Sequence, residues 1–158
     1  GKLIAMDIYE SKLKKLKNRA KRNGAHNIII KVIESTKPIK KLHKTADRVL
    51  IDAPCSGLGV LKRNPDSKWK LTEEFLTNIK ITQQNILKDY SKMVKPGGKL
   101  VYATCSILKS ENNKQIKDFL KSDSGVEFNF ESENVILSHQ SGFDGFYMAL
   151  LSRNKWKK

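Results

Sequence analysis

Apolar residues along this chain fall into short runs of the length of a β-strand, separated by longer segments of mixed polarity. The runs are rich in β-branched, Leu and aromatic residues and are bounded by charged residues, Gly or Pro, which is typical of strands. The predicted strands are LIAMD at 3–7, NIIIKVI at 27–33, RVLID at 48–52, KLVYAT at 99–104, VEFNF at 126–130 and GFYMALLSR at 145–153.

Three of the intervening segments have apolar residues at helical spacing. The first stops at Asn23-Gly24, the second is capped by Thr72, and the third has Ser110 as its expected cap. The apolar positions are Leu13, Leu16 and Ala20 in the first segment, Phe75, Ile79, Leu87, Tyr90 and Val94 in the second, and Ile116, Phe119 and Leu120 in the third.

Strands that alternate with helices predict an α/β fold made of βαβ units around a mostly parallel sheet. The last two predicted strands have no long helix between them, so we expect a hairpin with an antiparallel edge strand at the C-terminal end. At this length, residues 1–158 are expected to form a single domain.

The charge balance favours a polyanionic partner. The chain has 31 Lys and Arg residues against 16 Asp and Glu, a formal net charge of +15, and nucleic acid is the leading candidate. A Lys-rich composition that only keeps the surface solvated is the alternative. No apolar run approaches the roughly 20 residues of a membrane span. Two cysteines do not make a disulfide scaffold, so we expect free thiols in the reducing cytoplasm.

Acids and thiols follow the predicted strands at their carboxyl ends. Asp7 and Asp52 end the strands at 3–7 and 48–52, Cys55 lies three residues beyond Asp52, and Cys105 directly follows the strand at 99–104. Ligands bind at this edge of open parallel sheets, because loops and helix N-termini there offer unpaired backbone donors. One helix joins the strands at 48–52 and 99–104, so a right-handed crossover makes them neighbours and turns both thiols toward one place.

Either cysteine alone is more often a small buried apolar residue than a catalytic one. Both stand in polar turns, however, and a thiol near a basic surface or a helix N-terminus becomes more acidic and more nucleophilic. No metal site is expected, because the three histidines stand alone and the cysteines lack zinc-site spacing. The histidines are His26, His43 and His139.

Five segments resemble the RNA cytosine-5 methyltransferases of the RsmB/Nop/Sun type, in the family's order and over nearly the whole chain. They are DAPCSGLG at 52–59, KRNPDSKW at 62–69, KPGGKLVYATCSI at 95–107, ENN at 111–113 and GFDGFYMALLSR at 142–153. The paired PC and TC cysteines, each at a strand end, are specific, whereas KPGG alone would be weak.

The resemblance implies a Rossmann-like fold and an enzyme that methylates carbon 5 of cytosine in ribosomal or transfer RNA, with S-adenosylmethionine as cofactor. By that match Cys105 is the nucleophile that adds to carbon 6 of the base. Cys55 then assists the loss of the carbon-5 proton and the release of the enzyme. The residues themselves do not rank the two thiols, because their surroundings are alike; the assignment comes from the family.

The same match implies roles for further residues. Asp52 lies near the methyl donor and the target base, where a carboxylate accepts hydrogen bonds from an amine. Asp7 binds the ribose hydroxyls of the cofactor, and Pro54 fixes the loop that carries Cys55. Lys62 and Arg63 are weaker candidates for contact with RNA phosphate, since two basic residues in a loop are often only solvated.

Two departures from the family stand out. Family members carry an earlier strand and a Gly-rich loop around the methionine end of the cofactor, and no such segment occurs here. They also have an acid near the adenine, a position that Glu34 matches only loosely. The absent strand would lie between those ending at Asp7 and Asp52. We therefore expect a fragment of a longer chain that by itself binds S-adenosylmethionine weakly or not at all.

A second function class remains open, namely a non-catalytic RNA-binding module that descends from such an enzyme. A third class, the amino-group methyltransferases, fits poorly, because these place Pro-Pro-aromatic after the strand-end acid. Here Asp52 is followed by Ala53-Pro54-Cys55.

Overall fold

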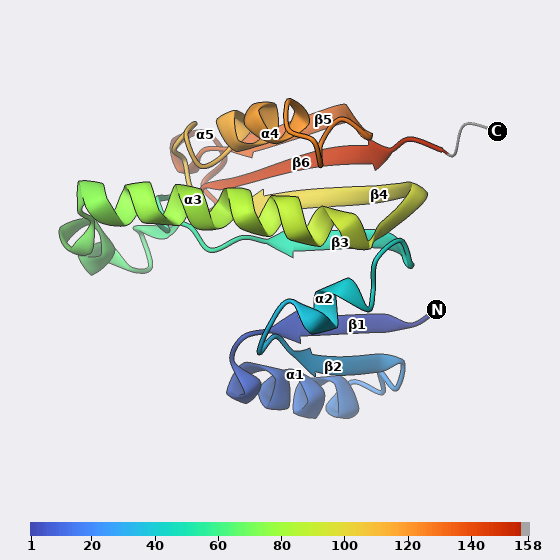
Figure 1. Ribbon diagram of the computed structural model, residues 1–158. Coiled ribbons are helices and arrows are strands. Elements are labelled where there is room, and N and C mark those ends of the chain that lie inside the picture. The colour runs from blue at the N-terminus through green and yellow to red at the C-terminus, as the bar shows by residue number, and fades with distance from the viewer. Residues whose placement is uncertain (156–158) are drawn as a thin grey trace. The chain divides into compact units, whose positions relative to one another are not determined.

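The computed structural model describes residues 1–155, except for the side chain of Lys70 (Figure 1). The chain divides into two compact units, the N-terminal unit Gly1–Leu42 and the C-terminal unit His43–Lys158. Among the described residues, no helix combines the length and the apolar character that crossing a membrane requires.

The N-terminal unit is a strand, helix, strand sequence, as predicted. β1 (Leu3–Asp7) and β2 (Ile28–Val32) pair in parallel, and α1 (Glu10–Arg22) connects them. Leu13 is the buried residue of α1, and the helix stops where Gly24 takes a positive φ of 68°. A short helix, α2 (Lys37–Lys40), follows β2.

The C-terminal unit contains a four-stranded sheet in the order β3, β4, β6, β5. β3 (Ala46–Asp52) and β4 (Val94–Thr104) pair in parallel, so the predicted crossover neighbours are adjacent. β6 (Phe146–Arg153) is antiparallel to both β4 and β5 (Phe128–Ile136). The α/β fold with parallel pairing and an antiparallel edge is confirmed. β6 lies one place in from that edge, which β5 occupies.

Two helices pack on this sheet. α3 (Glu73–Tyr90) contacts β3, α4 (Asn113–Leu120) contacts β5, and the helices contact each other (Figure 1). The fully buried core side chains come mainly from β4, β6 and α3 and include Leu87, Val94, Leu100, Tyr102, Tyr147 and Leu151. Short 3₁₀ helices η1 (Leu58–Val60), η2 (Pro65–Lys70) and η3 (Ser91–Met93), and α5 (Ser138–Ser141), fill the connections.

Several element ends differ from the predictions. β4, predicted for 99–104, begins at Val94 and includes the Pro-Gly-Gly segment that precedes the predicted strand. The sequence predicts a helix with an apolar stripe from Phe75 to Val94, but α3 ends at Tyr90 and η3 follows it. Val94 belongs to the sheet, where it pairs with Ala46. Asn112, not Ser110, holds the N-cap position of α4. β5 begins at Phe128 and continues through the polar stretch 131–134, since an edge strand can expose both of its faces.

Candidate active site

The structure brings the two thiols together. Cys105 directly follows β4, and Cys55 follows β3 after Ala53 and Pro54. Their Sγ atoms are 3.3 Å apart, close enough for a hydrogen bond, and both cysteines are free and half-buried. The parallel pairing of β3 and β4, with Asp52 opposite Ala103, explains the proximity, because both strands end at the same edge of the sheet.

Their contact makes the two thiols unequal. The hydrogen bond from Cys55 lowers the pKa of the Cys105 thiol to about 7, against the opposing effect of burial. The same bond, with burial as the second cause, raises the pKa of Cys55 above its ordinary value. Cys105 is therefore the more acidic thiol of the pair, and Cys55 the less acidic one. A thiolate is the nucleophilic form of cysteine.

Peptide groups on both sides of Cys55 are held by side chains from elsewhere. Gln83 Nε2 of α3 donates to the carbonyl oxygen of Pro54 at 2.9 Å, and the Ser56 amide donates to Glu111 Oε2 at 2.8 Å. Gln83 Nε2 also donates to Glu111 Oε2 at 3.1 Å. Glu111 and Gln83 are fully buried, so these bonds are shielded from water.

The turn that carries Cys105 is held in the same way. The Ser106 hydroxyl donates to Glu111 Oε1 at 2.9 Å, and Asn112 Nδ2 donates to the Ser106 carbonyl oxygen at 2.8 Å. The Thr104 hydroxyl donates to Asn112 Oδ1 at 2.6 Å. Ser56 and Ser106, each of which follows a cysteine, are hydrogen-bonded through their hydroxyls at 3.1 Å. Buried polar contacts thus run in parallel with the contact between the thiols.

Two glycines join a third loop to this site. The Gly59 amide donates to the carbonyl oxygen of Cys105 at 2.9 Å, and the Gly145 amide donates to that of Gly59 at 2.7 Å. A Cβ on Gly59 would lie 2.1 Å from the Gly145 oxygen, and one on Gly145 would lie 2.7 Å from Ile107. These positions accept only glycine, because the backbones cross too closely for a side chain.

Asp52 and Pro54 lie where the sequence placed them, and both side chains are exposed at the end of β3. The carboxylate of Asp52 is near enough to Cys105 to raise the pKa of that thiol, an effect smaller than the lowering by Cys55. Asp52 is therefore an exposed acid whose charge acts on the Cys105 thiol, and its role stays a prediction.

Asp7 and Glu34 belong to the N-terminal unit. Asp7 ends β1; its Oδ1 accepts the Tyr9 amide at 2.8 Å, and its Oδ2 is 3.8 Å from Lys12 Nζ. This turn holds the carboxylate at the start of α1 and leaves Oδ2 with only a long contact. Glu34 is exposed just after β2.

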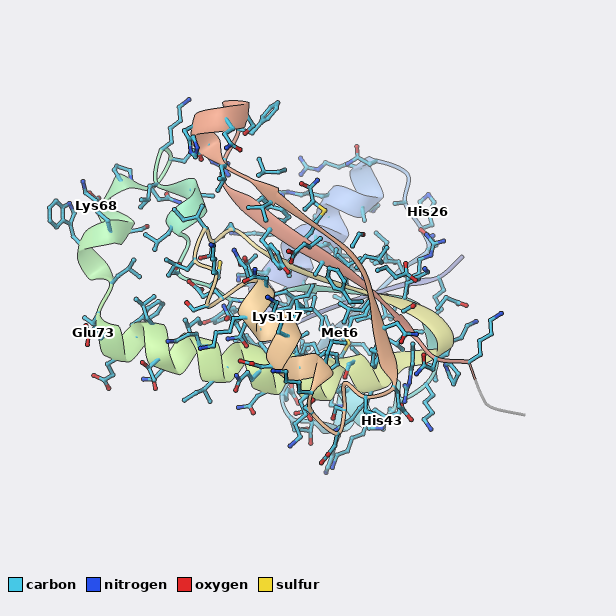
Figure 2. All side chains as sticks on the ribbon, turned by 90° about the horizontal axis from the view of Figure 1, so that it is seen from above. Met6, His26, His43, Lys68, Glu73 and Lys117 are labelled. Atoms are coloured by element: carbon cyan, nitrogen blue, oxygen red, sulfur yellow. The ribbon has the colours of Figure 1, made fainter. Side chains whose placement is uncertain are left out.

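Lys62 and Arg63 are exposed in the segment between η1 and η2. The Arg63 guanidinium pairs with Asp144 at 2.5 Å, so it ties this segment to the loop of Gly145. Farther along, Trp69 is 80% exposed, with Lys68 Nζ 4.7 Å from its ring centroid. Figure 2 shows Lys68 at the end of the unit where η2 leads into α3.

Sequence reasoning missed the buried polar residues that hold the two turns. Gln83 had a signal, since it lies four residues from both Ile79 and Leu87 and is therefore a polar residue within an apolar stripe. Glu111 and Asn112 were noted as a motif but not as contacts. Within the described part of the chain, no group of three or more His, Cys, Asp or Glu residues is arranged to hold a metal ion.

Known proteins resemble this chain in sequence and in structure. Ribosomal RNA small subunit methyltransferase B of Photorhabdus laumondii is 38% identical over 159 residues, which cover 97% of this chain and 37% of that protein. The structure of NSun6 from Pyrococcus horikoshii with SFG has a TM-score of 0.85 at 25% identity and covers 99% of this chain and 42% of that one. A methyltransferase homolog from the same organism has a TM-score of 0.81 at 22% identity, covers 97% of this chain and 53% of that one, and shows the same fold.

The chain spans about 37% of the length of the curated relatives it matches. Within that span the match is nearly complete, because the sequence model of one family covers residues 1–152. The chain belongs to the family described as 16S rRNA methyltransferase RsmB/F.

Proposed function

We propose that the protein methylates carbon 5 of a cytosine in RNA, with S-adenosylmethionine as methyl donor and a covalent bond from Cys105 to the base as intermediate. The observation that carries this proposal is the pair of thiols 3.3 Å apart, of which Cys105 has the lowered pKa. Relatives named ribosomal RNA small subunit methyltransferase B favour ribosomal RNA as the substrate, with transfer RNA as the second class to test.

The reaction begins when the Cys105 thiolate adds to carbon 6 of the cytosine ring, and the electron pair of the C5–C6 double bond moves to carbon 5. Carbon 5 then forms a bond to the methyl group of the donor sulfonium, and the electron pair of the broken bond stays on the donor sulfur. Loss of the proton from carbon 5 restores the double bond and expels Cys105 as a thiolate.

Cys55 is the base that takes this proton. In the free enzyme its pKa is raised first of all by its hydrogen bond with Cys105. Once Cys105 is bonded to carbon it carries no negative charge, so this cause disappears and the pKa of Cys55 falls toward its ordinary value. Cys55 can then lose its own proton to solvent, and the resulting thiolate takes the proton from carbon 5.

S-adenosylmethionine, when bound, supplies an electrophilic methyl group. Each unit carries one carboxylate that suits part of this molecule. In the N-terminal unit, Asp7 has a carboxylate oxygen with only a long contact to Lys12 and would bind ribose hydroxyls; in the C-terminal unit, the exposed carboxylate of Asp52 acts on the Cys105 thiol and would accept from an amine. Pro54 limits the backbone between Asp52 and Cys55. NSun6, solved with the S-adenosylmethionine analogue SFG, supports this donor.

The RNA contacts the exposed basic segment that follows η1. Lys62 supplies charge for a phosphate, and exposed Trp69, with Lys68 over its ring, suits a stacked base. The net charge of +15 favours the same partner. Thiols this close stay free only under reducing conditions, so we place the protein in the cytoplasm.

RNA that contains 5-azacytosine tests the covalent step, because nitrogen at position 5 has no proton to lose and the adduct persists. We expect an adduct with the wild-type protein and with Cys55→Ala, but none with Cys105→Ala, on a denaturing gel. Absence of an adduct from both the wild type and Cys55→Ala would contradict the proposal.

An RNA-binding module without catalysis is the second candidate, favoured by the lack of a Gly-rich cofactor segment within these residues. It predicts that the RNA is bound, that no adduct forms, and that no methyl group from labelled S-adenosylmethionine reaches the RNA. Methyl transfer that requires Cys105 would exclude it.

A further inference from the structure

We propose that Glu111 is a positioning residue that holds the two cysteine-bearing turns in register, so that Cys55 stays within hydrogen-bond distance of Cys105. This inference rests on the proposed roles of the two thiols. It concerns a residue that touches neither sulfur and acts through the backbone beside each of them.

Contacts of Glu111 reach both turns at once. Its Oε2 accepts the amide of Ser56, the residue after Cys55, and its Oε1 accepts the hydroxyl of Ser106, the residue after Cys105. Through Gln83, which donates both to Oε2 and to the carbonyl oxygen of Pro54, it also fixes the peptide group before Cys55. One side chain therefore spans the gap between two loops that are 50 residues apart in sequence.

The chemistry at this position calls for a carboxylate rather than a filler of the same size. Donors from Ser56, Gln83 and Ser106 converge on it, and both of its oxygens accept. Burying an acid with 0% exposure is costly unless every contact is satisfied. A packing role alone would be met at lower cost by an apolar residue, so the carboxylate indicates that the two turns must be joined by a polar contact.

The carboxylate also sets the direction of the hydroxyl contacts. Because Ser106 donates its proton to Glu111, its oxygen is left to accept the proton of Ser56. A glutamine at position 111 would keep the volume and could still accept from the Ser56 amide and Gln83. Its amide nitrogen would then face Ser106, which would have to accept and turn its own proton toward Ser56. The contact between the turns would persist in a weakened form.

Loss of this clamp has a measurable consequence at the sulfurs. The hydrogen bond from Cys55 is the main cause of the low pKa of Cys105. If the turns move apart, this bond lengthens, and the acidity of Cys105 returns toward that of an ordinary thiol. A residue with only a structural role would change stability without this change in acidity.

The test measures the pH dependence of Cys105 alkylation by iodoacetamide in the purified protein, read from the Cys105 peptide by mass spectrometry. Both Glu111 variants also remove a negative charge that raises the pKa of Cys105, but this is the smallest of the causes acting on that thiol, whereas the bond from Cys55 is the largest. We therefore expect Glu111→Ala to raise the midpoint from its wild-type value of about 7. Glu111→Gln loses the same charge but keeps most of the contacts, so its midpoint should lie below that of Glu111→Ala. Glu131→Gln, at an exposed acid on β5 that pairs with Lys99, is the matched control and should leave it unchanged.

Ser106→Ala keeps the test informative if the Glu111 variants do not fold, since it leaves the charge of Glu111 in place. It removes the bonds of the Ser106 hydroxyl to Glu111 Oε1, to the Ser56 hydroxyl and to the Leu108 amide, and should raise the midpoint by a fraction of a unit. Folded Glu111→Ala and Ser106→Ala variants with the wild-type midpoint would overturn the inference. The measurement uses neither RNA nor methyl donor. Failure of wild-type adduct formation would therefore count against the proposed function, and an unchanged midpoint against the role of Glu111.

Discussion

Replacing Cys55 by alanine removes the hydrogen bond that is the main cause of the low pKa of Cys105. Burial, which opposes that bond, remains, so the pKa of Cys105 should rise from about 7 to at least the ordinary thiol value of about 8.5. At pH 7 the thiolate fraction then falls from about one half to about 3%, a roughly fifteenfold loss of the reactive form.

Part of this loss is offset, because a more basic thiolate is a better nucleophile. With a Brønsted coefficient of about 0.4–0.5, a rise of about 1.5 pKa units makes each thiolate roughly fivefold more reactive. The net expectation is a rate about threefold below wild type at pH 7 that overtakes the wild-type rate near about pH 8. The sign follows from the direction of the shift: the wild type gains its advantage only below the ordinary thiol pKa.

Cys105 is alkylated by iodoacetamide in the folded protein between about pH 6 and 10, and the extent of reaction is read afterwards from the Cys105 peptide. The pH profile of the alkylation rate gives both its midpoint and its plateau. Cys55→Ser is the matched variant, since its hydroxyl can still donate a hydrogen bond and should give an intermediate midpoint. If Cys55→Ala and the wild type share one midpoint, the contact between the thiols does not control the acidity of Cys105 and the reasoning fails.

Three further substitutions test other parts of the site. Gly59→Ala places a Cβ 2.1 Å from the Gly145 oxygen and should destabilise the protein by about 1–3 kcal/mol in thermal unfolding; a variant as stable as wild type would show that these loops do not cross so closely. Thr72→Ala removes the cap of α3 and should cost about 1 kcal/mol, whereas exposed Thr77→Ala on the same helix should stay within about 0.5 kcal/mol. Lys62→Ala should weaken RNA binding and lower the slope of log K against log salt by about one; fluorescence anisotropy with an unchanged slope would remove Lys62 from the phosphate contacts.

The meeting of the two thiols could be predicted because it depends on topology alone. A single helix between the strands at 48–52 and 99–104 implies a right-handed crossover, and parallel neighbours end at one edge. Cys105 directly follows the end of β4, and Cys55 lies three residues beyond the end of β3. Segments this short leave the two cysteines little freedom to move away from that edge. Topology does not predict the 3.3 Å distance between the two Sγ atoms, but it does predict that the two cysteines lie at the same edge of the sheet.

Contacts that join distant segments were beyond the sequence. Glu111 lies in a polar stretch, SENN, that reads as an exposed turn, yet it is fully buried because Ser56, Gln83 and Ser106 converge on it. Nothing in its local sequence indicates burial, since its partners come from two loops and a helix. Gln83 was the better signal, as a polar residue in an apolar stripe needs a partner inside the protein.

The ranking of the two thiols shows most directly what three-dimensional placement adds. Each is followed by a serine, and each lies just past a strand, so their local sequences are nearly equivalent. In the structure burial raises the pKa of both thiols, whereas the shared hydrogen bond lowers the pKa of Cys105 and raises that of Cys55. The family resemblance and the lower pKa of Cys105 both favour the proposal that Cys105 is the nucleophile. Their agreement makes the pH midpoint of Cys105 the quantity on which the mechanism depends.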